Sequence, residues 1–137
     1  MTALLDTSFL LALTNPKDRN HKTALSTAQT IGGSLVLPLS VLPEVCYLLA
    51  SRSGHRPMRI FLANLAASDT ELEVITRGDL QRVVEILTQY ADSRLDFVDA
   101  TLVAIAERRD IATILTLDRR DFTIIRPQHC AYFDILP

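Results

Sequence analysis

Short apolar runs alternate with longer amphipathic segments along this chain, and no other feature of the sequence restricts its fold so strongly. Runs at residues 3–5, 34–37 and 112–115 are mainly apolar, and residues 71–75 alternate weakly between polar and apolar. Such runs are typical of strands in a sheet, and one more strand is expected at 123–125 or within 131–135. Strands that alternate with helices predict an α/β domain with a central, mostly parallel sheet of about five strands.

The segments between these runs carry apolar side chains at helical spacing and therefore predict helices. The first helix is expected to end before Pro16, and Asn20 to cap a second helix over residues 20–31. Ser40 is expected to cap a third helix that closes near Ser53. Pro57 is expected to begin a fourth, because the first turn of a helix does not need the missing N–H group.

Two further helices are expected in the second half of the chain. The first spans residues 79–90 and is expected to turn Leu80, Val83, Val84 and Leu87 inward. The second, over residues 96–109, is so apolar that almost no polar face remains. We therefore expect it to lie at the centre of the fold.

Composition limits the classes of function that are open to the chain. Its 137 residues, 48% apolar and 22% charged, suit one globular domain over residues 1–137. The net charge of −2 excludes a chain-wide positive field, so nucleic acid would have to bind at a local patch. Twelve of the 14 cationic side chains are Arg, which favours phosphate or carboxylate partners, although a compositional bias of the genome explains it equally well.

Cysteine usage and hydropathy bear on the cellular compartment. Cys46 and Cys130 are too few for a disulfide framework or a zinc cage, and their apolar surroundings suggest buried thiols in a reducing compartment. The most apolar region, residues 34–50, is interrupted by Pro38 and Glu44 and does not resemble a transmembrane helix. We expect a cytoplasmic protein without membrane contact.

Five acidic residues lie where predicted strands end or predicted helices begin. Asp6 directly follows the first strand, and Asp118 follows the strand at 112–115. Glu44 lies in the first turn of the third helix, and Asp96 and Asp99 open the central helix. Each can be explained separately as a turn former, a helix cap or a favourable charge at a helix start. Together they can meet at the carboxyl edge of a parallel sheet, where the sites of α/β proteins form.

Such a cluster needs cations, because two carboxylates about 5 Å apart repel by roughly 3 kcal/mol at an effective dielectric constant near 20. Oxygen ligands without His or Cys favour hard ions, namely Mg²⁺ or Mn²⁺. These ions bind phosphate oxygens and activate water, and an enzyme that cleaves phosphodiesters needs both functions.

Four short motifs, taken in order, resemble those of PIN-domain ribonucleases. They are LLDTSFL at residues 4–10, PEV at 43–45, DFVDA at 96–100 and TLDRRDF at 116–122. The resemblance covers the whole chain, and among PIN proteins a chain of this length most resembles the VapC-type toxins of toxin–antitoxin pairs. It implies a PIN-like three-layer fold, in which helices flank the sheet, and a Mg²⁺- or Mn²⁺-dependent endoribonuclease.

Carried over residue by residue, the resemblance implies that Asp6, Glu44, Asp99 and Asp118 form the catalytic, metal-binding cluster. Asp96 is an additional acid beside it and a further candidate ligand. The hydroxyl groups that would support these acids belong to Thr7, Ser8 and Thr116. The resemblance also implies an RNA substrate, a cognate antitoxin and a homodimer.

Three alternatives remain open. The chain could be a solitary PIN-domain nuclease in RNA processing, or a non-catalytic domain whose acidic groove holds a basic peptide. A phosphoryl-transfer enzyme with Asp6 as nucleophile is disfavoured, because position 8 is Ser where a second Asp is needed and no Lys follows Lys22.

The remaining polar residues give weaker signals. His21, His55 and His129 show no metal-ligand spacing, and surface or capping roles are expected for them. Asp121 is interpreted as a turn residue. RNA contact is considered for Arg119 and Arg120 beside Asp118, and RNA or partner contact for three arginines near a predicted helix break, Arg52, Arg56 and Arg59.

Overall fold

A computed structural model describes residues 1–137 and contains one five-stranded sheet. The strands are β1 (Ala3–Leu5), β2 (Leu35–Pro38), β3 (Glu71–Glu73), β4 (Thr113–Leu115) and β5 (Asp134–Leu136). Their order is β3-β2-β1-β4-β5, and every neighbouring pair is parallel. The predicted parallel sheet is therefore confirmed, and β1 and β4 lie side by side in its middle.

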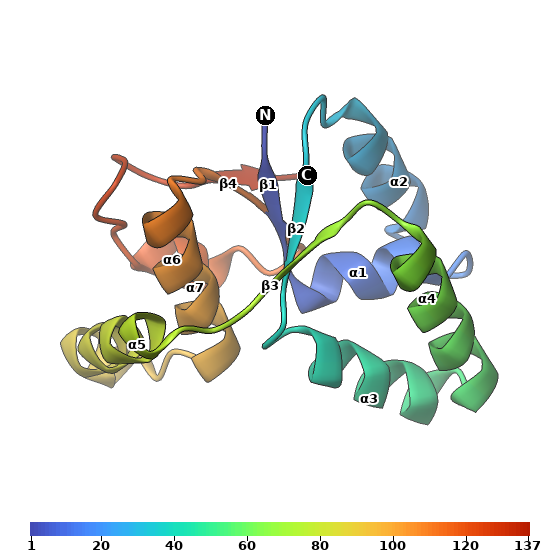
Figure 1. Cartoon of the computed structure of the whole chain (residues 1–137), viewed down its shortest axis with the longest axis horizontal. Coiled ribbons are helices and arrows are strands. Elements are labelled where there is room, and N and C mark those ends of the chain that lie inside the picture. Colours follow the sequence, from blue (N-terminus) through green and yellow to red (C-terminus); the bar gives the residue numbers. More distant parts are fainter.

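Seven α-helices connect the strands, because parallel strands require crossover connections. They are α1 (Thr7–Thr14), α2 (His21–Thr30), α3 (Leu42–Arg52), α4 (His55–Ala67), α5 (Arg77–Gln89), α6 (Phe97–Arg109) and α7 (Arg120–Ile124), with one 3₁₀ turn at Ala91–Ser93. Helices α1 to α4 lie on one side of the sheet and α5 to α7 on the other, which gives three layers (Figure 1). None of these helices is both long enough and apolar enough to cross a lipid bilayer.

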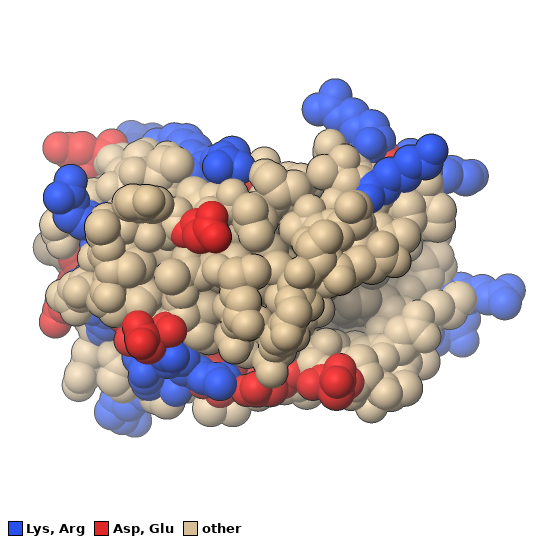
Figure 2. All heavy atoms as spheres, turned by 90° about the horizontal axis from the view of Figure 1, so that it is seen from above, with Lys and Arg blue, Asp and Glu red and all other residues tan.

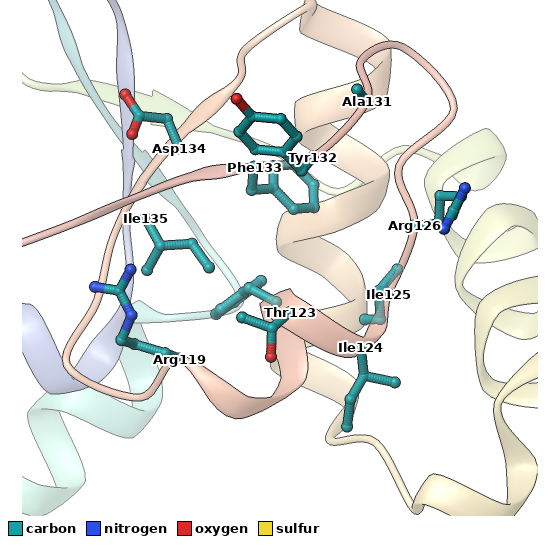
Figure 3. Close-up of a pocket in the computed structure, with 11 residues that line it drawn as sticks. Arg119, Thr123, Ile124, Ile125, Arg126, Ala131, Tyr132, Phe133, Asp134 and Ile135 are labelled. Carbon is teal, nitrogen blue, oxygen red and sulfur yellow. The ribbon is translucent and has the colours of Figure 1, made fainter.

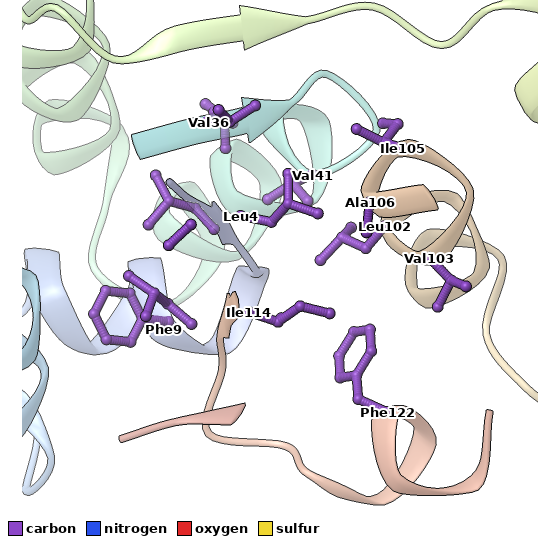
Figure 4. Close-up of a cluster of buried hydrophobic side chains, with 14 of the residues drawn as sticks. Leu4, Phe9, Val36, Val41, Leu102, Val103, Ile105, Ala106, Ile114 and Phe122 are labelled. Carbon is purple, nitrogen blue, oxygen red and sulfur yellow. The ribbon is translucent and has the colours of Figure 1, made fainter. Parts of the chain in front are cut away.

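The core lies between the sheet and the helices on both of its faces (Figure 4). Leu4 of β1 and Ile114 of β4 are fully buried, as are Phe9 of α1 and Leu102 of α6. Every residue of α6 from position 100 to position 106 is buried, so the prediction of a central helix at 96–109 is confirmed. The apolar sequence of α6 is explained by contact with neighbours on all sides.

Helix α5 turns a different face inward from the one predicted. Val83 and Ile86 are buried, whereas Leu80 and Val84 are 45% and 63% exposed. The helix carries two overlapping apolar stripes, and the rotation is fixed by Asp79, which receives hydrogen bonds from Arg108 of α6 at 3.0 Å. The inward assignment of Leu80 and Val84 is therefore wrong.

Three helix boundaries also differ from the prediction. Ser40 does not cap α3, because its hydroxyl is within 2.7 Å of the Thr101 hydroxyl on α6. Asn20 precedes α2 but forms no side-chain cap. Helix α4 begins at His55, two residues before Pro57, which the first turn accommodates. Residues 120–124 are helical, so the last strand is the one expected within 131–135, observed at Asp134–Leu136.

Candidate active site

An open cavity of about 320 Å³ lies at the carboxyl edge of the sheet, and six carboxyl side chains line it. We call it the acidic groove. Five of the six acids are the predicted ones, and the sixth is Asp121. The full set is Asp6, Glu44, Asp96, Asp99, Asp118 and Asp121. The parallel topology brings them together, because β1 and β4 are adjacent and both end at this edge.

Asp6 is the most deeply buried of these acids, with 4% of its surface exposed. It caps α1, and its Oδ1 atom accepts a hydrogen bond from the Thr7 backbone N–H at 2.8 Å. Its Oδ2 atom accepts a hydrogen bond from the Thr116 hydroxyl at 2.7 Å. Burial raises the pKa of Asp6 above its ordinary value, and the nearby charges of Glu44 and Asp118 add to this, while the two hydrogen bonds oppose it.

The hydroxyl groups of Ser8 and Thr116 join the first turn of α1 to the loop after β4. They lie 3.1 Å apart, and the Leu117 backbone N–H donates to Ser8 Oγ at 2.9 Å. The Asp118 backbone N–H donates to Thr116 Oγ1 at 3.0 Å. These contacts fix the loop that carries Asp118 against the start of α1, which Asp6 caps.

Thr7 behaves differently from the other two hydroxyl residues. Its Oγ1 atom is buried and has no hydrogen-bond partner, and the residue lines the acidic groove. Such orphaned groups are rare in folded proteins, because an unpaired buried hydroxyl costs about 1–3 kcal/mol. Thr7 thus borders the groove with a buried hydroxyl that no protein group satisfies, and it does not support the acids as Thr116 does.

Asp96, Asp99 and Asp121 form the side of the groove next to α6 and α7. Asp96 caps α6 through the Val98 backbone N–H at 2.7 Å, as expected for a residue at this position. Burial raises the pKa of Asp99 to about 9, helped by a hydrogen bond shared with Asp121 and by the charges of Asp6, Asp121 and Asp96. The groove thus holds more negative charge than the protein itself compensates.

Only one cation lines the acidic groove, and it is Arg52 at the end of α3. Glu44, Leu48 and Arg52 follow each other at intervals of four residues, so they share one face of the helix. Arg52 takes part in none of the ion pairs of the chain. On the face in Figure 2, Lys and Arg side chains are spread around the rim and form no continuous patch.

The geometry also bears on the ion that the groove could take. All charged ligands in it are carboxylates, and neither His nor Cys lines it, a donor set that suits Mg²⁺ or Mn²⁺. No three acidic, His or Cys side chains converge closely enough to form a ready-made cage. The carboxylate oxygens are suitable ligands for a hard cation. To coordinate it, the side chains would have to move closer together than they are in this structure.

The chain matches the PIN domain family over residues 3–126. It belongs to this family. Ribonuclease VapC26 of Mycobacterium tuberculosis is 33% identical to this PIN domain over 134 residues, which cover 98% of this chain and 99% of that protein. The 23S rRNA-specific endonuclease VapC20 of the same species is 28% identical, over 90% of this chain and 98% of that protein.

Solved structures agree on the fold. The crystal structure of Mycobacterium tuberculosis VapC20, described as a sarcin-ricin loop cleaving toxin, superposes with a TM-score of 0.79 at 27% identity, over 85% of this chain and 90% of that one. A toxin–antitoxin complex from Klebsiella pneumoniae shares the fold, with a TM-score of 0.68 at 21% identity, over 90% of this chain and 92% of that one. The expected PIN-like fold is thereby confirmed.

Asp121 is the acid of the groove whose position was predicted wrongly from the sequence of this PIN domain. It lies in the first turn of α7, not in a turn of the chain, and it is buried beside Asp99. Arg120 pairs with it at 2.6 Å and also donates to the Ser93 carbonyl oxygen, so its guanidinium is already engaged. The three-residue interval from Asp118 is the signal that could have indicated Asp121.

Apart from Arg52 and Asp121, the other weak signals lie outside the groove of the PIN domain. The imidazole of His21 is within 2.9 Å of the Ala12 carbonyl oxygen, and that of His129 is within 2.8 Å of the Ile111 carbonyl oxygen. Neither these two nor His55 lines the acidic groove. Arg119 points away from it and donates to the Pro137 carbonyl oxygen at 2.8 Å.

Proposed function

We propose that this PIN domain is a metal-dependent endoribonuclease, a hydrolase that cleaves RNA phosphodiester bonds in the acidic groove. The observation that carries the proposal is the convergence of six carboxyl groups on one groove lined by a single cation. Five of these six groups form no ion pair, which lowers the stability of the protein, and a site for a divalent cation explains why the charge is there. The identity with Ribonuclease VapC26 supports the same activity.

The residues proposed to hold Mg²⁺ or Mn²⁺ are Asp6, Glu44, Asp99 and Asp118, with Asp96 and Asp121 beside them. A divalent cation held there supplies an activated water and neutralises charge on the phosphate. Asp6 is the fixed point of the site, because both of its carboxyl oxygens accept hydrogen bonds in a buried position. The raised pKa of Asp99 makes this residue the one that gains most from a neighbouring positive charge.

Arg52 is proposed to position the substrate. Its guanidinium lines the groove two helical turns beyond Glu44 and has no carboxylate partner. Such a group can donate paired hydrogen bonds to a phosphate oxygen pair. RNA that lies in the groove would place a phosphate next to the cleaved one within its reach.

The proposal extends to the biological setting. Because VapC20 is described as a toxin and resembles this chain in sequence and structure, we propose that the protein is the toxin of a toxin–antitoxin pair with a cognate antitoxin. Cytoplasmic action on RNA and a homodimer remain part of this proposal. So does a single domain over residues 1–137, which is supported by β5 at Asp134–Leu136 completing the sheet beyond the matched region.

Cleavage of RNA by the purified chain tests the activity. With Mg²⁺ or Mn²⁺ it should cut an unstructured RNA or a 23S rRNA fragment, and EDTA should stop the reaction. The substitutions Asp6→Asn, Glu44→Gln, Asp99→Asn and Asp118→Asn should each remove most of the activity and should combine far from additively, since the acids hold the ion jointly.

The exposed Asp69→Asn in the loop before β3 is the matched control and should leave cleavage unchanged. Cleavage that survives Asp99→Asn would point to a contaminating nuclease. Absence of cleavage under all conditions, together with tight binding of a basic peptide, would favour the binding-domain alternative.

A further inference from the structure

A second hollow, of about 450 Å³, lies beside α7 and β5, and the proposed function gives it no role (Figure 3). We call it the α7–β5 hollow. Its floor is formed by buried apolar side chains, among them Phe122, Ile125, Phe133 and Ile135. The rings of Phe122 and Phe133 pack edge to face with centroids 6.3 Å apart, which gives the floor a fixed shape.

The rim of the α7–β5 hollow is polar and carries net positive charge. Arg119 and Arg126 contribute two guanidinium groups, and Asp134 contributes one carboxylate. Arg126 is exposed and forms no ion pair. Tyr132 also lines the hollow, and 77% of its surface is exposed, so its ring is accessible to a ligand. A flat ring that carries a negative charge matches these features, and a nucleotide is such a group.

One segment of the chain, residues 118–123, lies between the hollow and the acidic groove and contributes side chains to both. Asp118 lines the groove and the next residue, Arg119, lines the hollow. Helix α7 turns Asp121 toward the groove and Phe122 and Thr123 toward the hollow. The side chain of Arg119 is bonded to the end of the chain after β5, at the same edge of the sheet as the groove. A polynucleotide strand that leaves the groove past Asp118 therefore meets the hollow next.

We propose that the α7–β5 hollow binds a nucleotide of the RNA strand that flanks the cleavage site. Its base lies against Tyr132, and its phosphates lie near Arg119 and Arg126. This inference rests on the proposed RNA cleavage and assigns the substrate a second contact outside the catalytic groove.

The chain has no Trp, which permits a direct test of stacking. Tyr132→Trp places a single tryptophan at the hollow, and Tyr47→Trp places one at a similarly exposed tyrosine, 72% exposed, that lines neither cavity. In EDTA, which prevents cleavage, a short single-stranded RNA should quench the fluorescence of Tyr132→Trp and leave that of Tyr47→Trp unchanged. Adding Arg126→Ala should weaken the binding about fivefold or more, whereas the exposed Arg77→Ala should not.

Several outcomes would overturn the proposal. Quenching by a mononucleotide as strong as that by RNA would assign the hollow to a free nucleotide. Fluorescence that changes with protein concentration and not with RNA would assign it to a second copy of the chain. If wild-type protein cleaves RNA with Mn²⁺ while Tyr132→Trp shows no quenching, the hollow is not an RNA site and the proposed function stands. If wild-type protein does not cleave RNA, the proposed function itself fails.

Discussion

The pKa of Asp99 responds both to burial and to the negative charge of the other acids in the groove. It lies in the first turn of α6, directly before the buried residues 100–106, and its surroundings raise its pKa to about 9. Without a cation, the folded protein therefore holds a proton on Asp99 at pH values at which the unfolded chain, with a pKa near 3.8, does not. Folding and proton binding are coupled at this position.

This coupling predicts the sign of a pH effect on the metal-free protein. The raised pKa of Asp99 contributes stability that is complete below about pH 4 and is lost as the pH rises toward 9. The raised pKa of Asp6 acts in the same direction. The free energy of unfolding in EDTA, measured by urea titration, should therefore be lower at pH 8 than at pH 5.

The variant Asp99→Asn should reduce this pH dependence and should be more stable than wild type at pH 8, with a melting temperature several degrees higher. A variant that keeps the full pH dependence would contradict the assignment of the shift to Asp99.

Arg52 gives a second prediction at this scale. Arg52→Ala should raise KM for RNA about tenfold with little effect on kcat, because a charged hydrogen bond to a phosphate away from the reacting bond contributes binding only. It should also make RNA binding less sensitive to salt. Arg56→Ala is the matched control, since Arg56 is exposed on α4 and lines no part of the groove. Equal effects of the two substitutions would show that Arg52 has no special position.

At the scale of elements, ion pairs join α5 to α6, and none of the residues in these pairs lines the acidic groove. Asp79 forms a capping box with Thr76 and also receives Arg108 of α6. Burial opposes its ionisation, but the hydrogen bonds from Arg108 and Thr76 outweigh this and lower the pKa of Asp79. Arg82 adds two bonds to the Glu107 carboxylate, at 2.7 and 3.1 Å.

Asp79→Ala should therefore destabilise the protein by about 1–3 kcal/mol, because it removes a cap and leaves Arg108 without its buried partner. Asp69→Ala, at the exposed acid before β3, should change the stability by less than about 0.5 kcal/mol. Urea titration at pH 7 compares the two. An Asp79→Ala variant as stable as Asp69→Ala would show that the capping box and its ion pair do not stabilise the fold.

The elements also show what the sequence could and could not predict. Period and length indicated β1 to β4 and the central α6, because burial on one face or on all faces determines the spacing of apolar residues in the sequence. The last strand was left open between two segments, of which the second contains most of β5. The inward face of α5 was beyond reach, since an ion pair with α6 decides it. Helix α7 was ambiguous for a similar reason: its five residues are too few to show a helical period.

At the scale of the whole molecule, the strand order of the parallel sheet brings acids that are far apart in the sequence into one site. Asp6 and Asp118 are far apart in the chain, yet β1 and β4 pair in register, from Ala3 with Thr113 to Leu5 with Leu115. Their position at one edge followed from the α/β pattern. The inclusion of Asp121 and the exclusion of Arg119 did not, because both depend on the direction in which the short helix α7 leaves the loop.

The central claim is that the six carboxyl groups act together as one cation site. Thermal melting over a series of Mn²⁺ concentrations tests it most directly, because a ligand that binds only the folded protein raises its melting temperature. We predict that wild-type protein melts at progressively higher temperature as Mn²⁺ reaches the millimolar range. Asp99→Asn should start higher without metal and respond little. A wild-type melting temperature that does not depend on Mn²⁺, or an equal response of Asp99→Asn, would contradict the account.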